Sequence, residues 1–521
     1  MNKNFFFSWI MVLLVFSFGL VQSVATMPRA RPLSSQVMID TRIVDVTKPN
    51  FLGAGFLGGS FSFQEENPCR TEAAVPSDPY LKSRGALSRE YDDQWAVKRV
   101  GFTTDNDSTW HIEDGAKNPV VVAVIDTGLD WNHPDIDWRN IWKNSSEIAD
   151  NGIDDDKNGY VDDVIGWNFV GMNNKPWDED GHGTFVTGII AAAHNQEGIA
   201  GINRGAKIMV LKALNDFGQT RASFLAEAIF YAATNGAQVI NLSVGGKTLT
   251  RTEQEAVDYA RKKGALVVVA AGNEAVSTSD YAPAGLKGVI TVAATDVKDK
   301  RSSFSNYGQE IDLAAPGIDV LSLRAIRTDM LRGIPGIEYT PKSSYVGKNN
   351  RYYRASGTSF SAPMVAATAS LLLAKNPKLT NEQVKRMILH SATDVEVTGW
   401  DHLTGYGLLN ATAALNADPQ FYIETRIAGV KVAQKNGQMF LAVLGTIDSD
   451  KLSKAWIELG QGESPSNWKR VSDDIGKTIR DSRLTAIAAE NFRGSKIWVI
   501  KLVGQHENGR KREARFRLEL G

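Results

Sequence analysis

The sequence predicts an α/β protein, in which a parallel sheet carries helices on both faces and a small all-β sandwich domain follows. Three observations support this fold class. From about residue 95 to residue 415, strand-like and helix-like stretches alternate, which is typical of parallel sheets with crossover helices. Several strand-like runs, such as VVVAVI at 120–125, are apolar throughout, as in strands buried on both faces. After residue 421 the chain turns to short alternating stretches without helical periodicity.

The chain length predicts more than one domain, because 521 residues exceed what a single compact core usually holds. We expect a signal peptide at 1–25, a short N-terminal segment at 26–77, the α/β domain at 78–417 and the β-sandwich domain at 420–521. The formal net charge is −1, which gives no electrostatic reason to expect nucleic acid or an anionic membrane as a partner.

The N-terminus is typical of an export signal. Lys3 precedes the apolar run FFFSWIMVLLVFSFGL, and small residues at 23–25 follow where a signal peptidase needs them. A membrane anchor is the alternative, but no stop-transfer charges follow the run. Cys69 is the single cysteine, so an exported protein would hold no internal disulfide. We therefore expect a monomer that is secreted, either outside the cell or into a periplasm, and free of the membrane after signal cleavage.

The α/β region repeats one plan. RASFLAEAIFYAATNGAQVINLSVGG reads as a helix from Ser223 to a stop at Gly236, followed by a strand. TRTEQEAVDYARKKGALVVVAAGNE repeats helix, glycine stop and buried strand, and GVITVAATD adds one more strand. Asp126, Ser243 and Asn273 fall at carboxyl ends of these strands, where parallel sheets bind ligands.

The C-terminal hundred residues predict a separate β module. The stretches FYIETRIAG, MFLAVLGTI, KAWIELGQG and SKIWVIKLVGQHENGRKREARFRLEL alternate in polarity, and Asn508-Gly509 is a strong hairpin signal. The last strand is rich in Arg and Lys. Because glutamates interleave with them, a solvated strand face is favoured over a polyanion site.

Asp126 and His182 are the first candidates for chemistry. Asp126 stands in Asp-Thr-Gly, the motif of aspartic proteases, but no second Asp-Thr/Ser-Gly supplies the required partner. A structural cap is its simplest alternative. His182 lies between two glycines just before an apolar helix, and neither a His-Glu-x-x-His spacing nor another nearby histidine supports zinc.

Ser359 and Asn273 complete the set. Ser359 follows Gly-Thr at the start of a long helix, where it is either a cap or a hydroxyl aimed into a cleft. It is not a Gly-x-Ser-x-Gly elbow, because Ser361 stands where the last glycine belongs. Asn273 sits in a glycine turn at a strand end, where its amide could meet a developing oxyanion.

Together these residues resemble the subtilase family, including its thermitase-like members. The blocks VAVIDTGLDWNHPD, DGHGTFVTGIIAA, VINLSVGG, VVVAAGNE, FSNYG, LAAPG and SGTSFSAPMVAA occur in the family's order between about residues 78 and 415. The resemblance implies a subtilisin-like fold and a serine endopeptidase, with Ser359 as nucleophile, His182 as base, Asp126 as its orienting carboxylate and Asn273 as oxyanion donor.

The resemblance also implies how substrate binds. The segment 243–246 would pair with a peptide backbone, and the residues at 270–272 would line a pocket that prefers apolar side chains, with Glu274 at its rim. The implied substrate-binding residues are Ser243, Val244, Gly245, Ala270, Ala271 and Gly272. Phe185 and Met364 replace histidines found in many relatives, 324–352 is a long insertion, and 26–77 is short for an inhibitory propeptide.

Two calcium sites are expected in place of disulfides. In NGIDDDKNGYVDD, oxygen ligands alternate before a glycine at the sixth position, as in the first half of an EF-hand loop, although Ile165 stands where Glu would be. The alternative is a solvated acidic loop. The predicted ligands of this loop are Asp154, Asp156, Asn158, Asp162 and Asp163.

The second Ca²⁺ site is implied by the resemblance alone. Subtilases bind an ion at a loop that interrupts the helix after the catalytic histidine, and AAHNQEGIAG has the same length and composition. The residues carried over to this site are Asp78, Asp135, Ala193, Asn195, Glu197 and Ile199.

The sequence therefore predicts a secreted, calcium-stabilised serine endopeptidase of broad specificity that acts on proteins or peptides. A catalytically silent subtilase-like binding protein and an α/β surface adhesin are the alternatives. We further expect a mature N-terminus between about Cys69 and Asp78, because PCRTEAAVP has the composition of an exposed, cleavable segment.

Overall fold

The computed structural model describes residues 75–85, 89–326, 344–435 and 437–520, all within one compact unit, Cys69–Gly521. The expected signal peptide, the segment up to residue 74 with Cys69, and most of the insertion at 324–352 lie outside the described residues. No helix of the described residues is both long and apolar enough to cross a bilayer. The predicted division at residues 417–420 stays a prediction.

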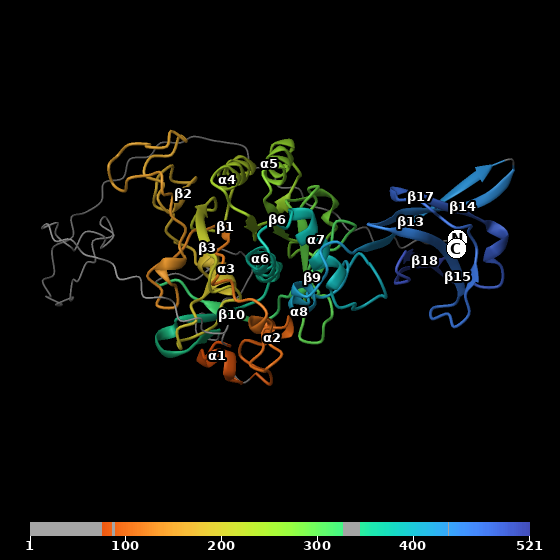
Figure 1. Cartoon of the computed structure of the whole chain (residues 1–521), viewed down its shortest axis with the longest axis horizontal. Helices are drawn as coiled ribbons and strands as arrows, with labels where there is room; N and C mark the ends of the chain where they lie inside the picture. Colours follow the sequence, from red (N-terminus) through yellow and green to blue (C-terminus); the bar gives the residue numbers. More distant parts are fainter. Residues whose placement is uncertain (1–74, 86–88, 327–343, 436, 521) are drawn as a thin grey trace, which may run out of the picture. The chain divides into compact units, whose positions relative to one another are not determined.

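A seven-stranded parallel sheet forms the centre of the α/β part (Figure 1). Its strands are rich in Val, Ile and Ala, and successive residues of the central strand face opposite cores, Val122 and Val124 on one side, Ala123 and Ile125 on the other. The sheet is thus buried on both faces, as the apolar runs predicted. In sheet order the strands are β2 (Gly166–Asn168), β3 (Lys207–Lys212), β1 (Val121–Asp126), β4 (Val239–Leu242), β6 (Leu266–Ala270), β8 (Ile290–Thr295) and β9 (Leu313–Pro316).

Helices cover both faces of this sheet. On one side α3 (His182–Ala191) and α6 (Thr358–Lys375) pack in the larger core, and on the other α4 (Ala222–Thr234) and α5 (Arg251–Lys262) pack in a second core. The predicted α/β fold is confirmed. The α4 helix begins one residue before the predicted Ser223, and α6 begins at Thr358, one residue before Ser359. The shorter helices are α1 (Pro79–Lys82), α2 (Trp95–Arg99), α7 (Asn381–Ser391) and α8 (Ala411–Leu415).

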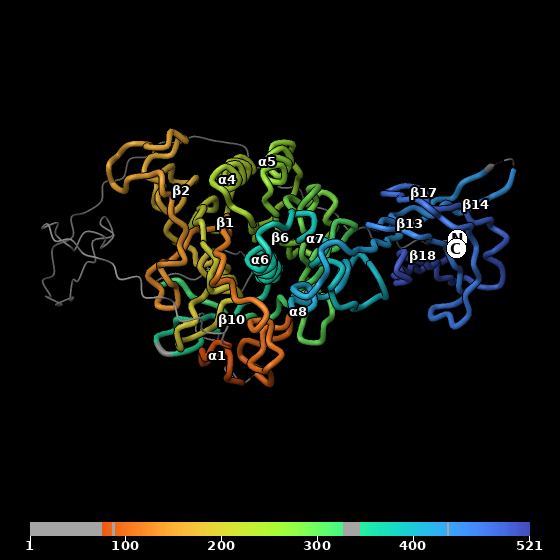
Figure 2. The backbone as a smooth tube through the Cα atoms, in the orientation of Figure 1, coloured from red at the N-terminus to blue at the C-terminus, as the bar shows by residue number. Residues whose placement is uncertain are grey.

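The C-terminal part is all-β, as predicted (Figure 2). Two antiparallel sheets share one core, with Val443 from the first sheet and Ile457 and Ile500 from the second fully buried. The predicted hairpin at Asn508-Gly509 joins its last two strands, with Gly509 at φ 86°. The first sheet contains β13 (Ile423–Lys435), β14 (Gln438–Ser449) and β17 (Ile479–Ala488). The second contains β16 (Lys469–Arg470), β15 (Leu452–Gln461), β18 (Ile497–His506) and β19 (Lys511–Glu519).

Strand order places the candidate residues together. β1 pairs with β3 on one side and with β4 on the other, and the chain crosses over β1 between these two strands. The strand order therefore reverses at β1, and α/β sheets bind ligands outside such a switch point. Asp126 ends β1, and the segments with Ser243 and Asn273 follow β4 and β6 at the same edge. Two small sheets complete the fold, β5 (Gly246–Lys247) with β7 (Tyr281–Ala282), and β10 (Val320–Leu323) with β12 (Tyr352–Ala355) and β11 (Tyr345–Val346).

Candidate active site

Asp126 and His182 form a hydrogen-bonded pair. Asp126 ends a buried strand and is 1% exposed, while His182 is the first residue of α3. The His182 Nδ1 and Asp126 Oδ1 atoms lie 2.7 Å apart, and the same oxygen accepts the N–H of Thr127 at 2.8 Å. A carboxylate in this position holds the ring so that Nε2 is the nitrogen free to take a proton.

A second carboxylate, Asp178, fixes the loop that carries the histidine. Its Oδ1 accepts the Gly181 N–H at 2.7 Å and the Thr127 hydroxyl at 2.9 Å, and the Thr127 hydroxyl oxygen accepts the Gly183 N–H at 2.8 Å. Asp178 thereby ties the end of β1 to the start of α3. It was not among the predicted site residues, and its place four residues before His182 was the only available signal.

The negative charges around His182 favour the protonated form of its imidazole. Burial lowers the pKa of His182, but the negative charge of Asp126 and the hydrogen bond to it outweigh burial and raise that pKa to about 9. Asp180 adds to this effect from two residues away. Burial in turn raises the pKa of Asp180 to about 7.

Ser359 lies in the first turn of α6 and is not its cap. The cap position belongs to Gly357, which forms no side-chain cap bond. The Ser359 hydroxyl donates to the carbonyl of Ser243 at 3.1 Å, so its single proton is not given to His182 in this conformation. Catalytic hydrogen bonds are often unmade before substrate binds.

Asn273 is held with its amide oxygen already occupied. That Oδ1 accepts both the backbone N–H and the hydroxyl of Thr358, each at 2.9 Å. The Asn273 NH₂ group is therefore the part of the side chain left to donate to a ligand beside Ser359. The contacts of Thr358 were not predicted, although it stands directly before Ser359.

The predicted substrate segment lies next to these groups. Ser243 is buried, whereas Gly245 and Gly246 are exposed, and strand pairing begins only with β5. A Cβ at Gly245 would lie 2.4 Å from the Tyr281 ring, so a side chain is excluded there. Ala270 and Ala271 are buried at the end of β6, Val244 is half-buried, and Gly272 has φ 101°.

The acidic loop brings in a residue that was not predicted. Carboxylate oxygens of Glu147, Asp154 and Asp156 lie within 4.8 Å of one another, a spacing that suits a cation. Glu147 lies outside the spaced motif, seven residues before it. Asn158 donates from its side chain to Asp156 at 3.2 Å, and its backbone N–H donates to Asp154 at 3.0 Å.

The two remaining acids of the motif accept hydrogen bonds from the protein. Asp162 accepts the N–H groups of Asn151 and Gly152, and Asp163 accepts side-chain N–H groups of Asn144 and Asn158. The Tyr231 hydroxyl also donates to Asp163. These bonds link Asp162 and Asp163 to the rest of the loop and Asp163 to α4, and the Asn158 side chain also joins Asp163 to Asp156.

Asp78 and Asp135 are fully buried at the loop after α3. One oxygen of Asp78 accepts the N–H groups of Asn195 and Gln196, and one oxygen of Asp135 accepts that of Ile199. The other oxygen of each carboxylate is buried without a hydrogen-bond partner among the described residues. Two carboxyl oxygens without partners, one on each buried side chain, are the kind of oxygen ligand that a hard cation takes, and its other ligands would come from the loop.

The other residues implied for this ion surround the two carboxylates. The Asn195 side chain donates to the Pro134 carbonyl at 3.3 Å, and its Oδ1 accepts the Glu197 N–H at 2.8 Å. Ala193 donates its N–H to the Asp135 carbonyl at 2.9 Å, which leaves its own carbonyl for a ligand.

The sequence matches a family model and several related proteases. The model of the subtilase family matches residues 117–407. The "Thermophilic serine proteinase" of Bacillus sp. (strain AK1) is 36% identical over 354 residues, which are 68% of this chain and 72% of the relative. "Thermitase" of Thermoactinomyces vulgaris is 33% identical over 62% of this chain and 94% of its own length. A solved protease structure from Pseudoalteromonas arctica PAMC 21717 aligns at 26% identity over 66% of this chain and 99% of that chain, with a TM-score of 0.49.

Proposed function

The chain belongs to the subtilase family and is a subtilisin-like serine endopeptidase, and we propose that Asp126, His182, Ser359 and Asn273 carry its catalysis. One observation supports this assignment most directly. The Asp126–His182 hydrogen bond, the Ser359 hydroxyl and the Asn273 amide come from four separate segments and meet at one edge of the sheet.

In the proposed reaction, Ser359 Oγ rotates from the Ser243 carbonyl to His182 Nε2 and attacks the peptide carbonyl carbon. The proton passes to Nε2, and Asp126 stabilises the imidazolium. The negative oxygen that forms is held by the Asn273 NH₂ group and the Ser359 N–H. The imidazolium then protonates the leaving amine, and a water activated by the same ring releases the acyl group.

Substrate binding is proposed to be mainly through backbone. The exposed edge at Gly245 and Gly246 can accept an extended peptide as an added strand, which gives broad specificity. The small residues at 270–272 leave room for an apolar side chain, so we propose an apolar preference at that position. Pairing with an extended backbone suits protein or peptide substrates, which we propose for this enzyme.

Calcium is proposed as a stabilising ion at two places. Asp78 and Asp135 would hold one ion with oxygens of the loop after α3, and Glu147, Asp154 and Asp156 would hold the other. The ion supplies no chemical step; it cross-links loops that would otherwise hold buried or crowded negative charge. We also propose secretion after removal of 1–25, a monomeric state, and maturation between about Cys69 and Asp78.

Labelling with a fluorophosphonate tests the catalytic assignment. The full chain is expected to take up one label per molecule, and Ser359→Ala to take up none while keeping its melting temperature within a few degrees. Ser361→Ala, two residues along the same helix, is the control and should still be labelled. A labelled Ser359→Ala variant would refute the assignment, and an unlabelled wild-type chain would favour a silent binding protein.

A further inference from the structure

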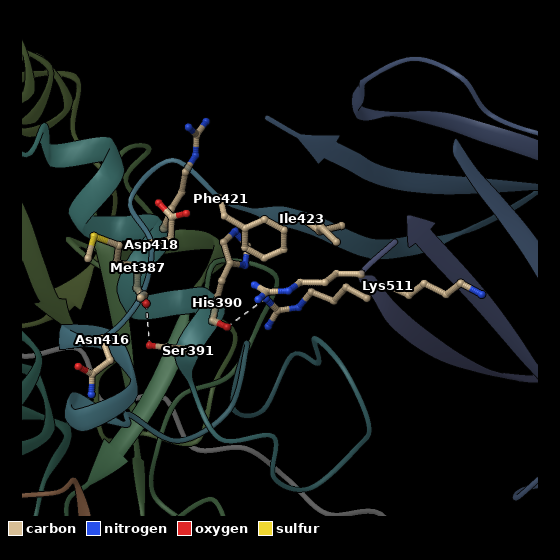
Figure 3. A pocket seen from close by; sticks show the side chains of 12 residues that line it. Met387, His390, Ser391, Asn416, Asp418, Phe421, Ile423 and Lys511 are labelled. Carbon is tan, nitrogen blue, oxygen red and sulfur yellow. Dashed lines mark hydrogen bonds between the residues drawn. The ribbon is translucent and has the colours of Figure 1, made fainter. Parts of the chain in front are cut away.

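A cavity of about 720 Å³ lies where α7 meets the β module, far along the chain from the catalytic residues. Its walls come from α7, from the segment 416–423 and from the turn between β18 and β19 (Figure 3). A volume of this size is in the usual range for small-molecule sites, roughly 300–1,000 Å³.

The lining carries an excess of positive charge. Arg386, Arg510 and Arg512 line the cavity together with a single carboxylate, Asp418. Lys511 also belongs to the lining, but its ammonium group extends away (Figure 3) and lies 5.4 Å from the Trp456 ring. Within the lining three guanidinium groups stand against one carboxylate, while the charges of Asp394 and Glu424 act on Arg512 from outside the lining.

Arg510 and Arg512 differ from five other arginines of the β module, and Arg386 of α7 is like them in this respect. Within the described residues, no carboxylate lies within ion-pair distance of the three cavity arginines. Elsewhere in the module five arginines are paired with carboxylates. They are Arg426 with Asp481, Arg470 with Asp474, Arg480 with Asp448, Arg515 with Glu513 and Arg517 with Glu463.

Aromatic rings hold two of the cavity arginines in place. The Arg386 guanidinium lies 3.9 Å from the Tyr422 ring centre, and that of Arg510 lies 4.9 Å from the Phe421 ring centre. A guanidinium stacked through its face keeps its N–H edge free for a planar or tetrahedral oxyanion. The rings thus orient the donors without neutralising them.

Arg512 and His390 complete the polar wall. Arg512 donates to the His390 carbonyl at 3.2 Å, and the His390 Nδ1 is buried with no hydrogen-bond partner among the described residues. Burial lowers the pKa of His390 well below its usual value, and the charges of Arg512 and Arg386 act in the same direction. A neutral ring adds no further positive charge to this wall.

We propose that this cavity binds a small organic phosphate monoester, with the phosphate held by Arg386, Arg510 and Arg512. A phosphate monoester carries about −1.5 to −2 charges at pH 7, which matches the excess in the lining better than one carboxylate does. The volume exceeds what a bare phosphate fills. Met387, Phe421 and Ile423 supply an apolar wall for the organic part.

Isothermal titration of the full chain tests the proposal, with adenosine monophosphate as probe at low ionic strength. We expect one molecule bound per chain, and Arg386→Gln and Arg510→Gln should each raise Kd by about tenfold, since each removes a charge-assisted contact. Arg517→Gln is the matched control, because Arg517 lies in β19, seven residues beyond Arg510, but pairs with Glu463. Its Kd should stay within about twofold of the wild-type value.

Three further probes separate the sources of affinity. Adenosine and succinate should bind at least about tenfold more weakly than adenosine monophosphate, and inorganic phosphate should bind at the same arginines but more weakly. The proposal is overturned if adenosine monophosphate does not bind at millimolar concentration, or if Arg386→Gln and Arg510→Gln leave Kd unchanged while melting like the wild type. Succinate binding as tightly as the phosphate ester would also overturn it. None of these readouts depends on peptidase activity.

Discussion

Ser359 and Ser243 exchange hydrogen bonds. The Ser359 hydroxyl donates to the Ser243 carbonyl at 3.1 Å, and the Ser243 hydroxyl donates to the Ser359 carbonyl at 2.8 Å. The candidate nucleophile is therefore tied to the segment that is proposed to bind the substrate backbone. A peptide that paired with this segment would lie directly beside the hydroxyl that is proposed to attack it.

Asn273→Ala is expected to lower kcat by roughly 10²–10³ with little change in KM, by analogy with the loss of other oxyanion donors. Alanine also removes the acceptor for the Thr358 N–H, so Asn273→Asp is the companion variant, since it keeps an acceptor and removes the donor. Both should lose activity, measured as kcat and KM on a chromogenic peptide. Activity of Asn273→Asp within threefold of wild type would contradict the role of the NH₂ group.

The pH profile should respond to Asp180. His182 accepts a proton only when neutral, so kcat/KM should rise with pH toward about 9, the raised pKa of this ring. Asp180 helps to stabilise the imidazolium. Asp180→Asn should therefore lower the pKa of His182 and move the rising limb to lower pH.

Glu179→Gln is the control for this profile, because Glu179 is exposed and its carboxylate lies 3.8 Å from Lys212. Its rising limb should stay at the wild-type position. An unshifted limb in Asp180→Asn would show that Asp180 does not act on His182.

Removal of calcium should destabilise the protein. An ion bound only to the folded state at about 100 times its Kd adds roughly 2.7 kcal/mol, so excess chelator should lower the melting temperature by several degrees. Asp154→Asn should lose part of this difference, because it removes one of the three clustered carboxylates.

Asp155→Asn serves as the neighbouring control. Asp155 accepts N–H groups from Ile148 and Asn151 and lies outside the cluster, so its substitution should leave the chelator effect intact. Equal melting curves with and without chelator in the wild type would exclude both proposed ions. Asp135→Asn tests the ion proposed at Asp78 and Asp135 in the same way, and it should also lose part of the chelator effect.

Gly183→Ala should damage the site without replacing any of the four residues that are proposed to carry catalysis. A Cβ at this position would lie 2.2 Å from the Gly128 carbonyl oxygen and 3.2 Å from the Asp126 Cβ, so α3 has to shift away from β1. Overpacking of this kind costs about 1–3 kcal/mol. We expect slower fluorophosphonate labelling and a lower melting temperature, whereas Gly476→Ala, which meets nothing within 4 Å, should change neither.

The sequence predicted four of the seven strands of the sheet, those at 121–126, 239–242, 266–270 and 290–295, because these strands are encoded locally. The runs around 120–125 and 266–270 are apolar throughout, and their polar ends identify the edge where Asp126 and Asn273 lie. The expectation of serine-protease chemistry rested on the order of the family motifs. Spacing along the chain alone cannot show that Asp126 lies within hydrogen-bond distance of His182.

Residues that act through contacts distant in sequence were missed. Glu147 reaches Asp154 and Asp156 only because the loop folds back, and no motif marks it. Arg386 and Arg510 stand 124 positions apart in the numbering and line one cavity only in the folded chain. Helix starts were displaced by one residue at Ser223 and Ser359, where the helix begins without a side-chain cap bond.

The hydrogen bonds of Thr358 limit how much the site must reorganise during the reaction. Its hydroxyl oxygen accepts the Gly272 N–H at 3.0 Å while its own N–H and hydroxyl donate to Asn273, so the start of α6 and the end of β6 form one rigid piece. The Asn273 NH₂ group and the Ser359 N–H, the proposed oxyanion donors, are thus already oriented before negative charge forms on the substrate oxygen. Water would have to turn its dipoles toward a growing negative charge, whereas fixed amides avoid that cost, which is the main advantage of a preorganised site over bulk solvent.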